Sequence, residues 1–215
     1  MAQVFPQWAN RVPLYAAAGV IALGLVVTAG VWYWGSPEFT DAGYQPEQPV
    51  AFSHRLHAGE LSIDCRYCHT TVERAAVATV PATSTCMNCH RLVGRDLPSI
   101  EPVRASAASG RPIRWTRVHK VPEYAYFPHD VHVRAGVGCS SCHGDVAAMD
   151  VVRQVEPLSM GWCLDCHRDP AAHLRAASDL TDTSWTPPAD QAELAAARIS
   201  ELRLAPPEAC SACHR

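Results

Sequence analysis

The sequence predicts a mainly α-helical protein with much irregular structure, in which one N-terminal transmembrane helix precedes a larger domain outside the membrane. Two features predict this fold class. An uncharged apolar segment occupies residues 14–34. The chain also contains 17 prolines, 10 cysteines and 11 histidines, but only 7% of its residues are aromatic. We therefore expect short helices, long irregular connections, few strands and an interior that aromatic side chains do not fill.

The overall composition excludes several classes of protein. Apolar residues make up 48% of the chain and charged residues 18%. This balance is typical of a globular protein, and it excludes a disordered regulator and a collagen-like fibre. The formal net charge is −3 at pH 7, which gives no electrostatic reason to expect a nucleic-acid partner.

The apolar segment from Leu14 to Trp34 is long enough to cross a membrane. At 1.5 Å per residue, a helix of this length extends roughly 31 Å, the thickness of a bilayer core. Arg11 precedes the segment, whereas the acidic residues Glu38 and Asp41 follow it. The positive-inside rule therefore places the N-terminus in the cytoplasm.

The apolar segment is predicted to remain in the chain as a membrane anchor. The alternative interpretation of the apolar segment is a cleaved signal peptide, but Val27-Thr28-Ala29 is a poor cleavage site and the apolar run is long for such a peptide. We expect a retained single-pass anchor in the cytoplasmic (inner) membrane, with the following domain on the periplasmic side. The predicted parts are a cytoplasmic tail (1–13), the anchor (14–34), a linker (35–50) and an extracytoplasmic domain (51–215).

The cysteines form five pairs with C-x-x-C spacing, and a histidine directly follows every pair. Two cysteines three residues apart lie within one helical turn, where both can bond covalently to the vinyl groups of one porphyrin. The adjacent histidine then reaches the iron from the same side. C-x-x-C-H is the attachment signature of c-type haem, so we predict five covalently bound haem c groups. The cysteines and proximal histidines are Cys65, Cys68 and His69 (motif 1), Cys86, Cys89 and His90 (motif 2), Cys139, Cys142 and His143 (motif 3), Cys163, Cys166 and His167 (motif 4), and Cys210, Cys213 and His214 (motif 5).

Other uses of these cysteines fit the pattern less well. A structural zinc site usually takes four protein ligands, so five pairs would form two sites and leave one pair over. Disulfide frameworks are common in exported proteins, but they do not require a repeated C-x-x-C-H. A thioredoxin-like redox site needs a single C-x-x-C pair. None of these alternatives explains the histidine after each pair.

An internal repeat groups the motifs into modules. Residues 52–69 and 127–143 both contain F-x-H-x-x-H followed by C-x-x-C-H, and a second attachment motif follows each of them. The chain therefore contains two predicted di-haem modules, at about 51–91 and 119–168, and a fifth motif at 205–215. Because the fifth motif comes last in the chain, we expect its haem at an edge of the haem cluster, facing a partner.

The repeat also supplies candidates for the second axial ligand of each iron. Two histidines at positions i and i+3 of a helix point roughly 60° apart, so they cannot both bind one iron that already has its proximal histidine. We expect them to reach two different haems. His173 is left over, and Met149 or Met160 is an alternative ligand at one site. The predicted distal ligands are His54, His57, His119, His129 and His132.

Two further segments carry interpretable patterns. Residues 189–204 predict an amphipathic packing helix, in which Ala195, Ile199 and Leu202 form an apolar stripe. Residues 104–120 contain five basic residues and no acidic residue. Because arginine pairs well with carboxylates, this segment either neutralises haem propionates or docks an acidic partner, and the sequence leaves both alternatives open.

The combination of F-x-H-x-x-H and C-x-x-C-H resembles the class III cytochromes c of the c3 and c7 type. In those families the first histidine ligates the haem that follows, and the second ligates a different haem. The resemblance therefore implies that His54 serves motif 1 and that His129 serves motif 3. Over nearly the whole chain, including residues 117–132, 157–170 and 210–215, the sequence is also similar to the membrane-anchored pentahaem cytochrome subunits of alternative complex III.

The resemblance implies an electron-transfer subunit in a quinol:acceptor oxidoreductase of a respiratory or photosynthetic chain. Its implied partners are an iron–sulfur protein, an integral-membrane quinol-binding subunit and a monohaem cytochrome c. The residues favour a relay over an enzyme, because an iron with two protein ligands has no open position for a substrate. The alternative is a pentahaem donor to a periplasmic reductase or a quinol dehydrogenase of the NapC/NrfH type. However, a single anchor helix offers little wall for a quinone pocket.

Overall fold

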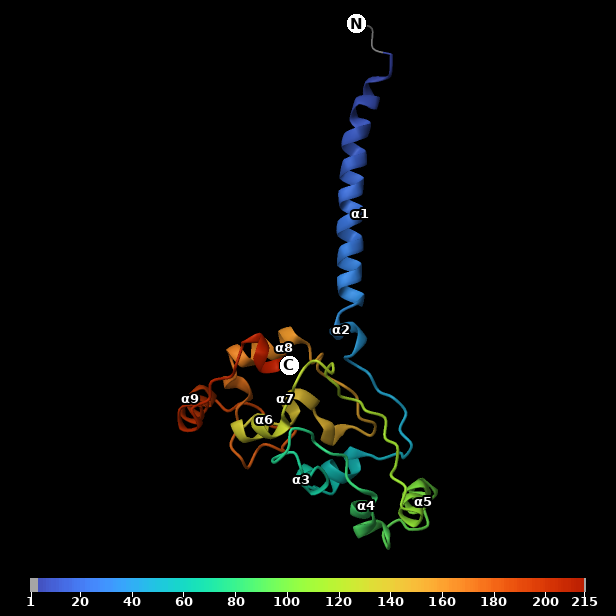
Figure 1. Cartoon of the computed structure of the whole chain (residues 1–215), viewed down its shortest axis with the longest axis vertical. Coiled ribbons are helices and arrows are strands. Elements are labelled where there is room, and N and C mark those ends of the chain that lie inside the picture. The colour runs from blue at the N-terminus through green and yellow to red at the C-terminus, as the bar shows by residue number, and fades with distance from the viewer. Residues whose placement is uncertain (1–3, 215) are drawn as a thin grey trace. The chain divides into compact units, whose positions relative to one another are not determined.

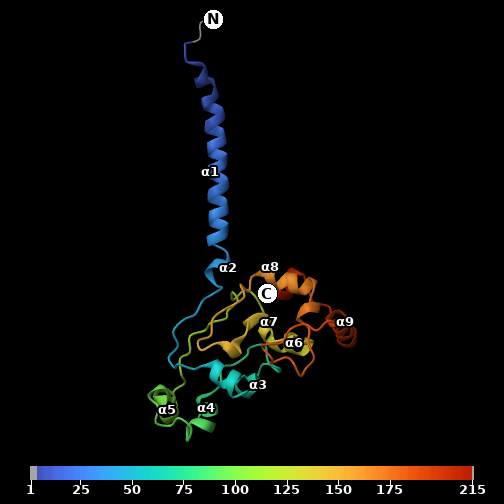
Figure 2. The same ribbon diagram turned by 180° about the vertical axis from the view of Figure 1, so that it is seen from behind.

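The computed structural model describes residues 4–214 and divides the chain into two compact units, Met1–Thr40 and Asp41–Arg215. The first three residues of the predicted tail and the last residue of the fifth-motif segment lie outside the described residues. The two units are described separately below (Figures 1 and 2).

The first unit consists of one long helix and two short ones. A 3-10 turn, η1 (Gln7–Arg11), leads into α1 (Val12–Trp34), and α2 (Pro37–Thr40) follows. A proline in the first turn of α1 suits a helix start, where its missing N–H has no partner to lose. Within the helical span Gln7–Trp34, the most apolar window has a mean hydropathy of 2.1, and none of that window is buried within the structure. By length and composition the helix is able to cross a membrane, which confirms the predicted N-terminal apolar helix.

The second unit is built from short helices joined by irregular segments. Among residues 41–214 the only extended pairings are two isolated β-bridges, Ala125 with His214 and Val137 with Leu174. The predicted fold class, mainly helical with much irregular structure, is therefore confirmed. The helices are η2 (Arg55–Glu60), α3 (Cys65–Cys68), α4 (Thr83–His90), η3 (Pro98–Ile100), α5 (Glu101–Ser109), α6 (His129–Ala135), α7 (Ser140–His143), η4 (Val146–Ala148), α8 (Met160–Arg168), η5 (Ala171–His173), α9 (Gln191–Leu202) and α10 (Cys210–Cys213).

The helix predicted over residues 189–204 is present as α9, which packs against η5. The side chain of Gln191 donates hydrogen bonds to the carbonyls of Ala171 and Leu174, at 2.6 and 2.8 Å. Ala195 is only 1% exposed, but Leu202 is 40% exposed. The predicted apolar stripe is therefore buried at its first position, whereas its last position faces solvent where the helix ends.

The two halves of the internal repeat interlock through their backbones. In the first half, η2 packs on η4 of the second half, and a Cβ at Gly59 would lie 2.5 Å from the carbonyl oxygen of Ala147. Glycine is therefore required at this close approach. Arg55 joins the same contact, because its backbone N–H donates to the carbonyl of Met149 and its guanidinium pairs with Asp150 at 3.0 Å.

The second unit buries few apolar side chains for its size. Only six hydrophobic residues of the described chain are buried, and the largest of them are leucines and a methionine. A soluble domain normally fills its interior with closely packed side chains. The six are Val50, Val103, Met149, Leu174, Leu180 and Ala195.

Candidate functional site: the five cysteine–histidine motifs

Every C-x-x-C-H motif lies on a short helix. Motifs 1 and 5 coincide with the single turns α3 and α10, motifs 2 and 4 lie in the last turns of α4 and α8, and motif 3 begins at the N-cap of α7. Asp64 caps α3 by accepting a hydrogen bond from the N–H of Arg66 at 2.8 Å. One helical turn brings cysteines three residues apart onto the same face, as attachment to one porphyrin requires.

The ten cysteines form no disulfide with one another. Burial raises the pKa of the Cys139 thiol to about 11 and that of Cys142 to about 12. Structural zinc usually takes four protein ligands, whereas among residues 4–214 no three His, Cys, Asp or Glu side chains converge.

Most of the proximal histidines are held in one orientation. The Nδ1 atoms of His69, His90, His167 and His214 lie 2.7–3.2 Å from backbone carbonyl oxygens. Since a carbonyl only accepts, Nδ1 must carry the proton, and Nε2 keeps its lone pair. A hydrogen bond of this kind fixes the tautomer and the ring direction of a metal-binding histidine. These four rings are therefore oriented to bind haem iron through Nε2.

Three of the predicted distal histidines show the same arrangement. His57 donates from Nδ1 to the carbonyl of Ser53, and His132 donates to that of Pro128, both at 2.8 Å. The corresponding bond of His129 crosses the repeat to Ala76, at 3.0 Å. The remaining two have buried ring nitrogens without a hydrogen-bond partner, at Nδ1 of His54 and Nε2 of His119. An unpartnered buried nitrogen is costly, and a ligand to Nε2 of His119 would remove that cost.

Several histidine rings form pairs with the spacing of two axial ligands. Two imidazoles that bind one metal from opposite sides have centroids roughly 6 Å apart, given metal–nitrogen bonds of about 2.0 Å. The centroids of His57 and His90 lie 6.1 Å apart, and those of His132 and His167 also lie 6.1 Å apart. In each repeat, the second histidine of F-x-H-x-x-H therefore faces the second attachment motif of its own module.

Two predicted distal ligands lie near motif 3. The ring of His129 is 6.4 Å from that of His143 and nearly parallel to it, whereas the ring of His119 is 4.3 Å away and steeply inclined. Only the longer spacing leaves room for an iron between the rings, in agreement with the pairing that the family resemblance implies. At motif 5, the ring that packs near His214 is Tyr124, with centroids 5.8 Å apart.

Burial keeps the central histidines neutral. Desolvation lowers the pKa of His54 and of His119 to about 4, and that of His143 to about 3. The charge of His69 adds to the effect on His54, which places that ring within reach of motif 1. Neutral imidazole is the form that binds a metal, so these residues are in the ligating state at neutral pH.

The phenylalanine of each repeat orients both histidines, a role that the sequence analysis did not assign. Phe52 stacks on His57 at 4.3 Å and meets His54 edge-on at 4.8 Å. Phe127 contacts the two histidines of the second repeat with nearly the same geometry, at 4.4 and 4.8 Å. The signal was present in the sequence, because the phenylalanine recurs at the same position of both repeats.

The alternative ligands occupy different surroundings. Met149 is buried, with 6% of its surface exposed, and lies in the contact between the two repeats. Met160 begins α8 and is 66% exposed. His173, which the sequence analysis left without a role, lies in η5, and its carbonyl accepts a backbone hydrogen bond from Gly138.

The first two motifs lie side by side. The hydroxyl of Tyr67, inside motif 1, accepts a hydrogen bond from Asn88, inside motif 2, at 3.0 Å. The intervening residues of the two motifs therefore form a direct contact.

Direct contacts place the remaining motifs in a row. The carbonyl of Leu180 accepts a hydrogen bond from the N–H of Cys139, and the hydroxyl of the adjacent Thr181 donates to Asp64, the N-cap of the motif 1 helix. Helix α6 carries both the ring that faces motif 3 and the ring that faces motif 4. The imidazole of His167 donates to the carbonyl of Pro207, just before motif 5, at 2.7 Å. The order of the motifs in space is therefore 2–1–3–4–5. The first module runs in reverse, with motif 1 next to motif 3 and motif 2 at one end.

Known proteins resemble parts of this chain. Residues 125–215, which contain motifs 3 to 5, match the family described as cytochrome c7 and related cytochrome c. A curated relative is the multihaem cytochrome c subunit of menaquinone reductase from Nitratidesulfovibrio vulgaris (strain Hildenborough), which is 31% identical over 139 residues. The match covers 60% of this chain and 65% of that protein. The chain thus resembles cytochrome c7 over residues 125–215 and is similar to a protein named as a multihaem cytochrome c subunit of menaquinone reductase.

Proposed function

We propose that this chain carries five covalently attached haem c groups and relays electrons within a quinol-linked membrane complex. The observation that carries the proposal is the spacing of three pairs of histidine rings, each of which leaves room for an iron at an attachment motif. The shortage of buried apolar side chains supports it, because bound porphyrins would supply the missing interior.

In this proposal, the residues of the chain hold and orient the haems. The ten cysteines attach them, and the five motif histidines are the proximal ligands. His57 is the distal ligand at motif 2, His132 at motif 4 and His129 at motif 3, while His54 faces motif 1. Bound haem iron supplies reversible one-electron chemistry. An iron with two histidine ligands has no position for a substrate, and we propose no catalytic site on this chain.

The proposed setting follows from α1 and from the relative. α1 would anchor the chain in the cytoplasmic membrane, with the N-terminus inside and the haem domain on the periplasmic side. The proposed complex is alternative complex III, and the partners are an iron–sulfur protein, an integral-membrane quinol-binding subunit and a monohaem cytochrome c. The menaquinone reductase in the relative's name favours a second candidate, in which the same relay delivers electrons toward a quinone.

The haem content of the holoprotein tests the proposal directly. The intact mass under denaturing conditions is expected to exceed the polypeptide mass by five haems, with no titratable thiol remaining. The haem absorbance per polypeptide should agree with that count. Four haems, or bound zinc, would contradict the assignment of all five motifs.

Replacing His57 with alanine tests the ligand pairing. We expect one haem of five to change from low-spin to high-spin, since the ring that faces His90 is removed. Electron paramagnetic resonance of the oxidised protein measures this change. His173→Ala is the matched control and should leave all five signals as they were. A spectrum of His57→Ala identical to wild type would show that His57 is not an axial ligand.

A further inference from the structure

The segment beside motif 2 is strongly basic. Residues 91–120 contain seven basic and two acidic side chains, a net charge of +5 in a chain whose total is −3. The rest of the protein is therefore clearly acidic, and positive charge is concentrated in this one stretch. Such an asymmetry produces a local field that attracts acidic molecules.

Internal carboxylates do not neutralise this charge. Elsewhere in the second unit, Arg55, Arg66, Arg134 and Arg168 each pair with a carboxylate at 2.6–3.1 Å. Within residues 91–120 the only ion pair among described residues joins Arg95 to its neighbour Asp96, at 3.9 Å. The guanidinium groups of Arg91, Arg111 and Arg114 are exposed and have no carboxylate partner in the described chain. These three arginines are called the basic surface below.

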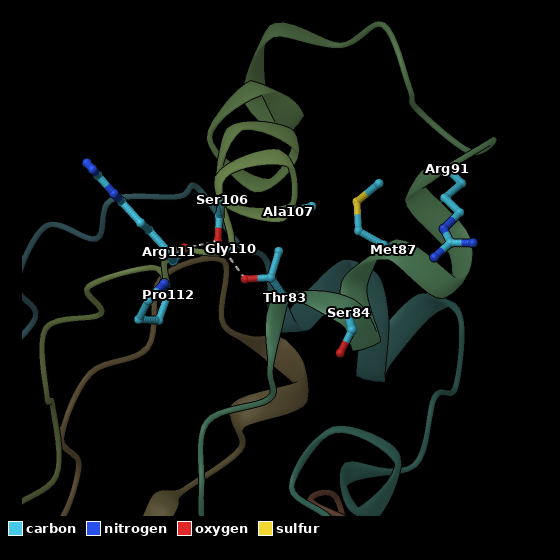
Figure 3. A pocket seen from close by; sticks show the side chains of 9 residues that line it. All are labelled: Thr83, Ser84, Met87, Arg91, Ser106, Ala107, Gly110, Arg111 and Pro112. Carbon is cyan, nitrogen blue, oxygen red and sulfur yellow. Dashed lines mark hydrogen bonds between the residues drawn. The ribbon is translucent and has the colours of Figure 1, made fainter.

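Two arginines of the basic surface, Arg91 and Arg111, lie beside the helix that carries motif 2. α5 packs on α4, and the hydroxyls of Thr83 and Ser106 join the two helices at 2.7 Å (Figure 3). Residues of both helices line an open pocket of about 400 Å³, and Arg91 and Arg111 are among them. Thr83, Met87 and Arg91 follow one another at intervals of four residues, so they share a face of α4 that differs from the face of the motif cysteines.

Motif 2 also stands at one end of the row of motifs. It contacts motif 1 through Asn88 and Tyr67, whereas hydrogen bonds and facing rings give motifs 1, 3 and 4 a neighbour on both sides. Electrons that pass along the whole row must enter or leave at its ends, which are motifs 2 and 5. A redox partner must therefore reach one of these two ends. The end at motif 2 lies beside the unneutralised basic surface.

We infer that the basic surface docks an acidic electron-transfer protein, which exchanges electrons with the haem of Cys86 and Cys89. The inference rests on the proposed function. Arginine pairs bidentately with carboxylates, and complementary charge speeds the encounter of redox proteins. In each encounter a reduced partner loses one electron, and one ferric haem becomes ferrous. No bond is made or broken, and no proton is required.

The test uses the full-length holoprotein and flavodoxin hydroquinone as an acidic one-electron probe. Reduction of the haems is followed by stopped-flow absorbance from low to physiological ionic strength. The wild-type rate should fall as salt rises. Arg111→Glu should lower the low-salt rate about tenfold, within the range of electrostatic steering, and flatten its salt dependence. Arg153→Glu is the matched control, because this arginine is also exposed and has no ion pair in the described chain.

Three results would overturn the inference. Equal effects of Arg111→Glu and Arg153→Glu would show that only net charge matters. A shifted midpoint potential with unchanged salt dependence would assign Arg111 to a haem propionate. In nanodiscs, slower wild-type reduction when phosphatidylglycerol is added to phosphatidylcholine, with Arg111→Glu unaffected, would show that the surface faces lipid. Dithionite separates these failures from failure of the relay, since it should reduce all five haems in every variant.

Discussion

A chain that carries no haem is expected to be unfolded beyond residue 40. The second unit buries only six hydrophobic side chains, and ordering the backbone costs about 1–2 kcal/mol for each residue. Substitution of all ten cysteines by serine prevents attachment and removes the porphyrins that we propose as its interior. Far-UV circular dichroism should then retain the signal of α1 and lose that of the short helices, which isolation makes unstable.

The holoprotein is the reference for this experiment, and limited proteolysis provides a second measurement. Segments after residue 40 should be cleaved rapidly in the haem-free chain and resist cleavage in the holoprotein. A haem-free chain with native circular dichroism and native protease resistance would show that the polypeptide forms its own core, contrary to the burial seen here.

Removal of single haems is expected to reveal the spatial order 2–1–3–4–5. Cys65→Ala/Cys68→Ala removes haem 1 and should isolate haem 2 from the other three. Reduction by flavodoxin hydroquinone should then split into a fast phase of one haem and a phase of three haems at least about tenfold slower, as a barrier about 1.4 kcal/mol higher produces. Stopped-flow absorbance measures both amplitudes.

Cys86→Ala/Cys89→Ala is the matched variant, because it removes a haem from the end of the row. Its four remaining haems should be reduced in a single phase, since haems 1, 3, 4 and 5 stay contiguous. Haem counting by mass confirms that each variant retains four haems. If the split appears in the second variant and not in the first, the haems follow the order of the sequence and the spatial order proposed here is wrong.

The features that the sequence predicted correctly are local in origin. The apolar run that became α1 depends on side chains within one helix. The same holds for α9, which lies between proline pairs and differs from the predicted range by two residues at each end. Each attachment motif consists of five consecutive residues, so it too is local. Their assignment to haem stays a prediction, although all five lie on the short helices that this chemistry requires.

The pairing of histidines depends on contacts that the sequence does not display. His129 is oriented by the carbonyl of Ala76, 53 residues away, and no pattern in the sequence relates these two positions. Likewise, the sequence analysis assigned five distal histidines without knowing that His119 and His129 both lie near His143. These three rings belong to the second module, and only the folding of that module brings them together.

By itself, the sequence determined the composition of this protein's parts: an apolar helix, five attachment motifs, a repeated histidine pair and a basic segment. The tertiary structure decided their arrangement, including the reversal of the first module and the position of motif 2 at an end of the row beside the basic surface. The physical reason is range. Helix formation and cysteine spacing act within a few residues, whereas the order of the motifs is set by backbone contacts such as Gly59 with Ala147, which join segments far apart in the chain.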